Sequence, residues 1–230
     1  MKSLLFILLV VFLLGNIQAE TVHDKHINRT FEIQDIEGWT CLVNVDVTKD
    51  KDWPMAKRIM SNHLFTLKRF IKDEVVKDMQ KVKIYVDIKQ KGKSGAEYHP
   101  SKKWLVDNKF SPEKAKCIEI SDVSQFIRYT KTQPFVMLHE LFHSYHDQVL
   151  KFDNKEILEC FNKAMKTGKY EKVQHISGRQ VKHYSCTNHK EYFSEAAEAY
   201  FGTNDYFPFV RPQLMEFDPD ICEFLKKLAK

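Results

Sequence analysis

The sequence predicts an α+β protein, with a small sheet and a long helix in its N-terminal half and helices in its C-terminal half. Three observations support this class. Strand-like alternation of apolar residues occurs before about residue 121, helical spacing dominates after it, and no repeat or Pro-rich linker divides the chain. With 230 residues, 43% apolar and 29% charged, we expect a single domain over residues 20–230.

The first nineteen residues have the pattern of a cleaved secretory signal peptide. Lys2 is followed by an apolar run from Leu4 to Leu14, and the small residue Ala19 suits the cleavage site. The alternative, an uncleaved anchor, is disfavoured because the run is short against the roughly 20 residues that a bilayer requires. We therefore expect a secreted, extracellular protein that does not contact a membrane after signal cleavage.

The N-terminal half contains the predicted strands. Residues 20–30 are polar and are expected to form a loose arm, and residues 31–47 alternate on both sides of Glu37-Gly38, which predicts two strands and a turn. Helical spacing begins at Pro54 and continues to Met79, which predicts one long amphipathic helix. Residues 82–88 and 117–120 are predicted strands, and residues 89–100 a loop.

The C-terminal half contains predicted helices with recognisable ends. Asp122 or Ser124 can cap a short helix, and Pro134 can start one over residues 135–150. A third helix covers residues 155–166. A fourth is capped by Asn188 and stops at Gly202, and the last covers residues 219–228.

The charge and the cysteine content give expectations about partners and disulfides. The net charge is +5, or +4 without Lys2, and lysines alternate with acids, so no nucleic-acid partner is expected. In an oxidising compartment the five cysteines could form up to two disulfides, whose pairing stays open. They are Cys41, Cys117, Cys160, Cys186 and Cys222. Asn28-Arg-Thr30 is a glycosylation sequon.

His139-Glu-Leu-Phe-His143 is the strongest motif of the chain. Residues four apart lie on one face of a helix, so both imidazoles can bind one metal ion, and Glu140 can accept a proton from metal-bound water. The neighbouring residues of this helix are mostly apolar, and burying two histidines and a glutamate among them is costly unless a metal pairs with them. Two core histidines held by hydrogen bonds are the alternative.

A catalytic zinc takes a third protein ligand, and two of the candidates are weak. His146 lies two helical turns from His139, too far for the three histidines to converge on one ion, and is expected to act as a supporting or surface group. Asp205 follows Gly202-Thr-Asn, which partly matches the ligand segment of another zincin branch. A polar turn that closes a helix is the favoured interpretation of that segment.

The third candidate lies in a row of carboxylates. Glu191, Glu195 and Glu198 occupy one face of the helix after Asn188, among packed aromatic and alanine residues. Glu191 can bind the ion. Glu195 can accept the free N–H of a ligating histidine, and Glu198 is expected to be solvated or structural.

The segment Tyr184-Ser-Cys-Thr-Asn188-His-Lys-Glu191-Tyr-Phe-Ser-Glu195-Ala, together with the His-Glu motif, resembles the catalytic domain of the anthrax lethal factor-like zinc metallopeptidases. The resemblance covers residues 134–203. It implies a zincin-like fold, one Zn²⁺ held by His139, His143 and Glu191, and Glu195 as the support of a ligand histidine. It also implies that Tyr184 contacts the transition state.

These observations predict a secreted, monomeric zinc metallopeptidase that hydrolyses a peptide or protein substrate, with Glu140 as general base. The alternative is a secreted, non-catalytic binding protein on the same scaffold. A membrane-acting toxin is disfavoured because no amphipathic or apolar segment occurs outside the signal. His99, His183 and His189 are expected at the surface.

Overall fold

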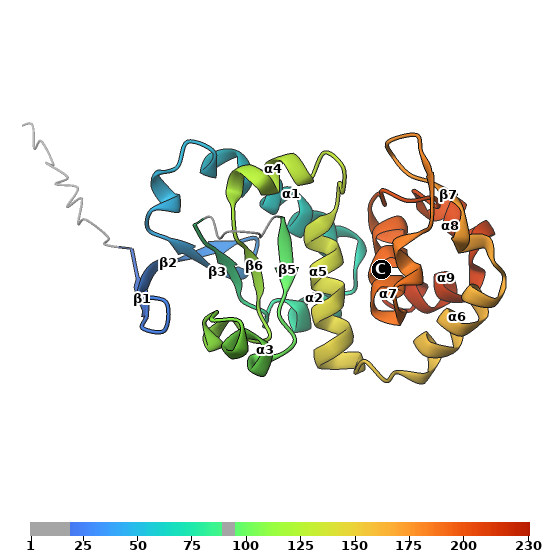
Figure 1. Ribbon diagram of the computed structural model, residues 1–230, viewed down its shortest axis with the longest axis horizontal. Helices are drawn as coiled ribbons and strands as arrows, with labels where there is room; N and C mark the ends of the chain where they lie inside the picture. The colour runs from blue at the N-terminus through green and yellow to red at the C-terminus, as the bar shows by residue number, and fades with distance from the viewer. Residues whose placement is uncertain (1–18, 89–94) are drawn as a thin grey trace, which may run out of the picture.

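The computed structural model describes residues 19–88 and 95–230 and shows a mixed six-stranded sheet beside a helical half (Figure 1). The predicted signal peptide, apart from Ala19, and residues 89–94 of the predicted loop lie outside the described residues. The strands are β1 (Thr21–Asp24), β2 (Arg29–Ile36), β3 (Trp39–Asn44), β4 (Ile84–Val86), β5 (Ala96–Tyr98) and β6 (Ile118–Ile120). The α+β class is therefore confirmed at the level of a mixed α/β architecture.

The sheet order is β1-β2-β3-β4-β6-β5. β4 is parallel to β3 and β6, and the other pairings are antiparallel. The β2–β3 hairpin has the predicted turn: Glu37 and Gly38 both take positive φ, +57° and +92°, as a two-residue turn of this kind requires. β5 is an edge strand and contacts α5.

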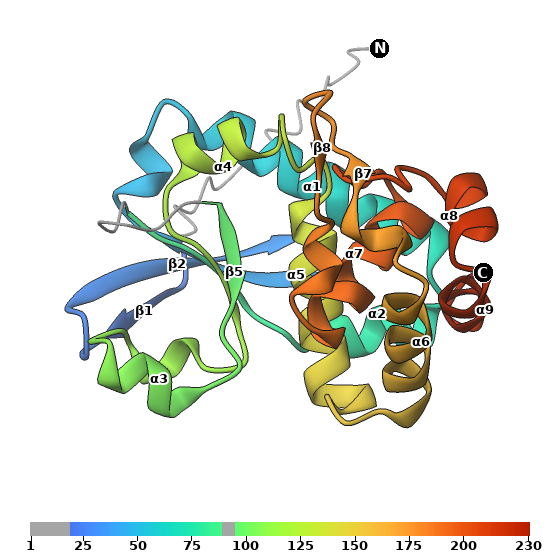
Figure 2. The ribbon, with the colours of Figure 1, turned by 45° about the vertical axis from the view of Figure 1, so that its right-hand side comes forward.

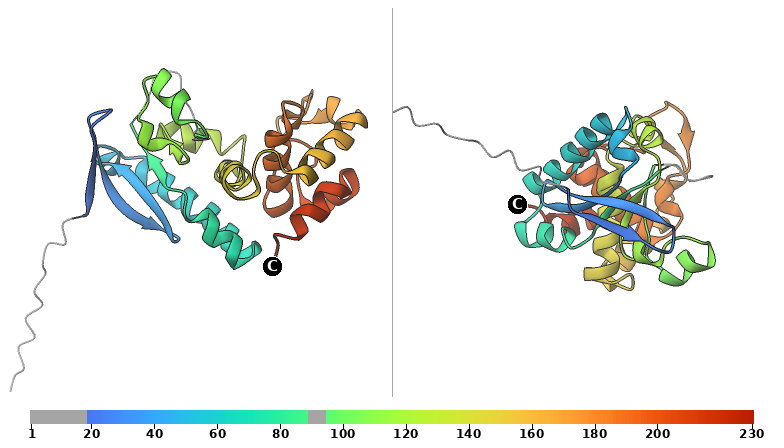
Figure 3. Two further views of the ribbon diagram at one scale, coloured as in Figure 1. Left: turned by 90° about the horizontal axis from the view of Figure 1, so that it is seen from below. Right: turned by 90° about the vertical axis from the view of Figure 1, so that its left-hand side faces the viewer.

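Alternation along the strands gives the sheet two different faces. Val43, Val86 and Ile120 belong to the main core, which the sheet shares with the helices. Their neighbours on the opposite face include Leu42 and Tyr85, which form a smaller cluster. Figure 3 shows the β1–β2 hairpin (blue) at the end of the molecule farthest from the last helices (red).

The helices of the described chain follow the predicted pattern with two additions. They are α1 (Trp53–Phe70), α2 (Asp73–Met79), α3 (Lys102–Asp107), α4 (Val123–Tyr129), α5 (Val136–Tyr145), α6 (Lys155–Lys166), α7 (His189–Phe201), α8 (Arg211–Phe217) and α9 (Pro219–Lys226). The two helices that the sequence did not predict, α3 and α8, have six and seven residues, too few to show a period. A two-stranded ribbon, β7 (Val173–Gln174) and β8 (Gln180–Val181), precedes α7.

Two predictions for the N-terminal half differ from the structure. Residues 20–30 do not form a loose arm, because β1 pairs with β2 along its whole length. The predicted helix 54–79 is two helices, because Ile71 is extended and bridges Ala229, while Lys72 N donates to Leu228 O. A helical period cannot reveal this break, since the partner strand lies at the far end of the chain.

α5 lies between the sheet and the C-terminal helices, and α7 packs beside it (Figures 1 and 2). The two helices approach closely at Gly202, just after α7. A Cβ at this position would lie 2.7 Å from the Phe135 ring, at the start of α5. Glycine therefore permits the contact that brings the polar residues of α5 and α7 together.

Candidate metal centre

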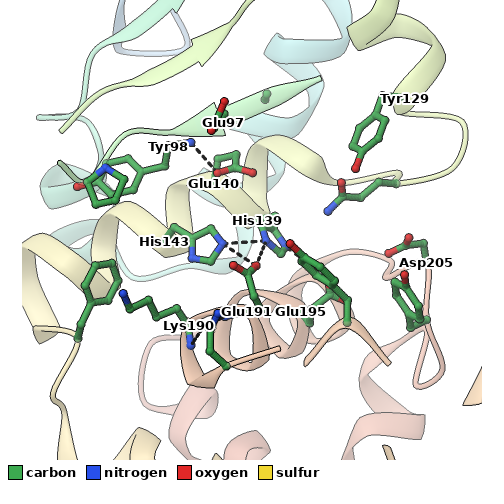
Figure 4. Close-up of a pocket in the computed structure, with 17 residues that line it drawn as sticks. Glu97, Tyr98, Tyr129, His139, Glu140, His143, Lys190, Glu191, Glu195 and Asp205 are labelled. Carbon is green, nitrogen blue, oxygen red and sulfur yellow. Dashed lines mark hydrogen bonds and ion pairs between the residues drawn. The ribbon is translucent and has the colours of Figure 1, made fainter. Parts of the chain in front are cut away.

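The site is built from the facing sides of α5 and α7 (Figure 4). His139 and His143 lie one turn apart on α5, a helix whose other side chains are mostly buried in the core. α7 begins at the predicted cap: the Asn188 side chain accepts hydrogen bonds from Lys190 N and Glu191 N. The first turn of α7 therefore presents Glu191 to the two histidines.

Three side-chain atoms converge in the arrangement of a metal site. His139 Nε2 lies 2.9 Å from His143 Nε2, and Glu191 Oε2 lies 3.1 Å and 3.0 Å from the same two nitrogens. Ligands about 2.1 Å from a tetrahedral ion are separated by roughly 3.4 Å, a few tenths of an ångström more than these distances. Two imidazole nitrogens and a carboxylate oxygen are also a common donor set for zinc. His139, His143 and Glu191 thus form a candidate metal-binding group.

The charges of this group are strongly coupled. Burial raises the pKa of Glu191, but hydrogen bonds with His139 and His143 outweigh it and hold the pKa far below its usual range. Burial disfavours the charged form of His139, but Glu191 and Glu198 outweigh it and raise the pKa of this ring. The carboxylates therefore favour positive charge at this position, as a bound cation would supply.

Glu198, and not Glu195, orients the His139 ring. Glu198 Oε1 lies 2.7 Å from His139 Nδ1 and also accepts from Gln133 Nε2 at 3.0 Å, whereas Glu195 Oε1 is 3.6 Å from the same nitrogen. Glu198 therefore occupies the position at His139 that was expected of Glu195, and it is buried and not solvated. At about 100° per residue, position 198 lies about 20° from the direction of Glu191 around α7 and position 195 about 40°.

Behind the metal-binding group lies a buried acidic cluster formed by Glu195, Glu198 and Asp205. Within the described chain, one oxygen of each carboxylate is buried and has no hydrogen-bond partner. Burial and the neighbouring Glu198 raise the pKa of Glu195, and they raise the pKa of Asp205 to about 7. His139, Glu195 and Glu198 form a second group whose atoms could hold an ion, and Asp205 belongs to neither group.

Glu140 faces the cavity from the other side of the metal-binding group. Its Oε2 accepts a hydrogen bond of 2.8 Å from Tyr98 N, in the edge strand β5. Burial raises the pKa of Glu140, against the lowering effect of His139 and His143. The β5 backbone thus holds this carboxylate beside the two imidazoles without neutralising it.

A cavity of about 590 Å³ opens over these residues. His139, Glu140, His143 and Glu191 line its floor. Tyr184, from a one-turn helix at Tyr184–Cys186, lines its wall with 45% of its surface exposed. The predicted metal and catalytic residues are therefore all brought to one cavity.

The remaining predicted histidines are more buried than expected. His146 is fully buried against Phe152 and Phe193, and no described residue bonds either ring nitrogen. Burial lowers its pKa to about 3. His99 and His183 are each only 2% exposed, and His189, half-buried, shares a hydrogen bond with Phe152 O. Each of these rings packs against aromatic side chains, so the surface assignments of His99 and His183 were wrong.

The predicted disulfides do not occur in the structure. All five cysteines are free: four are buried and Cys186 is half-buried. They lie on separate elements and pack as small apolar side chains, and burial raises the pKa of each thiol, in Cys41 to about 12. Asn28 is exposed in the β1–β2 turn, where its glycosylation stays a prediction.

Comparisons with known proteins found no match: no family model, curated protein or solved structure resembles this chain significantly. Among the residues that the structure describes, no helix is both long and apolar enough to cross a bilayer. The functional conclusion therefore depends on the site itself.

Proposed function

We propose that this chain is a secreted zinc metallopeptidase with a zincin-like fold. The observation that carries the proposal is the convergence of His139, His143 and Glu191 beside Glu140, at the floor of one cavity. An ion-binding site alone would need no carboxylate held next to it by the backbone of an edge strand. A metallopeptidase needs both a metal and a base.

The donor set favours zinc. Two histidines and one carboxylate are three ligands of the kind found in catalytic zinc sites, which keep a further position for water or substrate. A zinc ion held there would polarise the scissile carbonyl and lower the pKa of a bound water. Glu198 would fix the His139 ring, because it accepts the hydrogen bond of the nitrogen that faces away from the ion.

Glu140 is proposed as the general base. Its carboxylate lies in the cavity and its raised pKa makes it a better proton acceptor than an ordinary glutamate. It would take a proton from the attacking water and pass it to the departing amine. Tyr98 N–H orients one of its oxygens, so the other oxygen is available for this transfer.

Tyr184 is proposed to donate a hydrogen bond to the oxygen of the scissile carbonyl as negative charge develops there. Its side chain is exposed within the cavity and has the freedom to approach a substrate. β5 could bind the peptide itself, since it is the last strand in the sheet order and lines the same cavity with Ala96 and Glu97. A peptide or protein substrate and a monomeric enzyme are the simplest form of this proposal.

Zinc content and peptide cleavage test the proposal together. Purified protein should contain one zinc per chain; His143→Ala should abolish stoichiometric zinc and Glu191→Ala should weaken its binding strongly. Asp205→Ala and His26→Ala, a substitution far from the site, should retain zinc. If Asp205→Ala loses the metal while Glu191→Ala keeps it, the ligand assignment is wrong.

Glu140→Gln separates binding from chemistry. It keeps the size of the side chain but removes proton acceptance, so zinc content should stay near normal while turnover falls on the order of 10²-fold or more. Glu223→Gln, whose side chain is exposed on the outer face of α9, is the matched control. Undiminished cleavage by Glu140→Gln would reject the mechanism, and zinc binding without cleavage of any library peptide by wild type would favour the non-catalytic binding protein.

A further inference from the structure

Asp205 is held rigidly at one end of the cavity. Its own carbonyl oxygen accepts from Ile176 N at 2.7 Å, and the next residue is fixed by a bond from Tyr206 N to Asn204 Oδ1. Asn204 Nδ2 in turn donates to Glu195 O on α7. The loop that carries Asp205 is thus tied both to the β7–β8 ribbon and to the helix that supplies the metal-binding glutamate.

The Asp205 carboxylate is incompletely paired. The residue is only 8% exposed, yet it lines the same cavity as Glu140. Oδ1 is buried without a hydrogen-bond partner among the described residues, and Oδ2 has His175 Nε2 at 3.3 Å. Figure 4 shows the side chain directed into the cavity, across from Tyr129. Because Oδ1 is buried from solvent, a cation in the cavity would contact Oδ2, which has in the described chain only the long 3.3 Å contact with His175.

The charged groups around Asp205 also favour a cation at this end of the cavity. Glu198 and Glu195 lie close to it, so this end of the cavity is rich in carboxyl groups, and a cation bound there would favour their charged forms. Of the described residues that line the cavity, Lys190 is the one Lys or Arg, and Figure 4 shows it on the opposite side of His139. Its ammonium lies over the Phe152 ring, 4.1 Å from the centroid. The cavity is therefore acidic at one end and basic at the other.

Aromatic rings form walls at the acidic end. Tyr129 and Tyr184 expose 42% and 45% of their surface, and both line the cavity with Tyr206. The Tyr206 ring is kept in place by stacking on His183, with 4.9 Å between the ring centroids. Planar guanidinium groups stack on such rings while they donate to a carboxylate, and alkylammonium groups also bind near ring faces.

We propose that Asp205 and the tyrosines around it form a subsite for a cationic side chain of the peptide substrate, arginine above all. This inference rests on the proposed peptidase function and adds a substrate class to it. An arginine bound there would place its guanidinium against Asp205 while the peptide backbone extends over Glu140. The Lys190 end of the cavity would repel the same side chain, which gives the substrate one direction in the site.

The test uses fluorogenic peptides that carry a single arginine at successive positions in an alanine–leucine background, each matched to a peptide with citrulline in its place. Citrulline keeps the shape of arginine but is neutral. Wild type should favour arginine at one position by about 10- to 100-fold in kcat/KM, the range for a charge-assisted hydrogen bond at a part-buried site. Asp205→Asn should reduce this ratio to about 3-fold or less, and Asp107→Asn, on exposed α3, should preserve it.

A binding measurement separates this inference from the proposed function. Fluorescence anisotropy of the same peptides on Glu140→Gln and on the Glu140→Gln/Asp205→Asn double variant reports recognition without cleavage. Arginine-selective binding that requires Asp205, with no cleavage by wild type, would uphold the subsite and reject the peptidase. Cleavage by wild type with an arginine-to-citrulline ratio near one, or a ratio that Asp205→Asn leaves unchanged, would overturn the subsite while the peptidase stands.

Discussion

The molecule buries two polar clusters, one on the sheet and one between α5 and α7, and they differ in how completely they are paired. On the sheet, Lys114 Nζ lies 2.6 Å from Asp87 Oδ2 and 2.5 Å from Glu119 Oε1. The other oxygens are paired as well: Asp87 Oδ1 accepts from Asn44, and Glu119 Oε2 lies 2.8 Å from His99. Between α5 and α7, by contrast, one oxygen each of Glu195, Glu198 and Asp205 has no hydrogen-bond partner in the described chain.

This difference distinguishes a structural cluster from a binding site. The sheet cluster contains its own cations, and Arg29 adds a second one 2.6 Å from Asp87 Oδ2. It is accommodated in the fold without any ligand, because a buried charge is tolerated when it is paired and hydrogen-bonded. The α5–α7 cluster has an excess of carboxyl groups and opens into a cavity, and we propose that a metal ion and a substrate supply positive charge to it.

Lys114→Met should have the largest effect. It leaves Asp87 and Glu119 buried with fewer partners, so we expect a loss of about 3–5 kcal/mol in the free energy of unfolding, measured by denaturant titration. His143→Ala, studied without zinc, should lower that free energy far less, because the α5–α7 cluster is incomplete without the ion. Equal losses for the two variants would remove the distinction between the clusters.

Tyr184→Phe tests whether the cavity over the α5–α7 cluster is a catalytic site. The substitution removes one hydroxyl and keeps the ring, so fold and zinc content should be retained and KM should stay similar. We expect kcat to fall by roughly 10- to 10³-fold, the range for the loss of one oxyanion donor or somewhat less. A variant with wild-type kcat would show that Tyr184 only lines the cavity and has no chemical role.

Glu198→Gln tests whether the α5–α7 cluster orients His139, a proposed metal ligand. The amide is a poorer partner than the carboxylate for His139 Nδ1–H, so we expect zinc affinity to fall about 10- to 100-fold in a competitive chelator titration. Glu195→Gln, on the same helix and 3.6 Å from that nitrogen, is the matched control and should have a smaller effect. A larger loss of zinc affinity in Glu195→Gln than in Glu198→Gln would support the prediction from the sequence that Glu195 holds the ligand histidine.

The last prediction concerns the pH dependence of the unfolding free energy that comes from the sheet cluster. Burial raises the pKa of Glu119, but the hydrogen bond with His99 and the charge of Lys114 outweigh it and lower the pKa from 4.5 to about 2. A lowered folded-state pKa stabilises the protein above the unfolded value and loses that contribution as pH falls through the folded value. The difference in unfolding free energy between wild type and Glu119→Gln should thus be largest above pH 5 and shrink towards pH 2. A difference that does not change with pH would show that Glu119 is not held in its charged form.

Local patterns determined much of the fold. The bounds of α6 and the Asn188 cap of α7 agree with the predictions from the sequence, because capping and helical spacing act within a few residues. The Glu37-Gly38 turn agrees with them for the same reason. The break at Ile71 does not, because it depends on pairing with Ala229. The free cysteines likewise depend on which elements pack together.

For the site, the sequence by itself determined the residues that share a helix face. His139, Glu140 and His143 follow from a spacing of four on α5, and Glu191 could be proposed because it starts a helix with other acids on one side. Tertiary structure alone decided how α5 and α7 are aligned. Their relative rotation directs Glu198 to His139 Nδ1 and brings Asp205 to the edge of the same cavity. A sequence gives the angle of a side chain about its own helix, whereas the distance between two helices depends on the packing of the whole core.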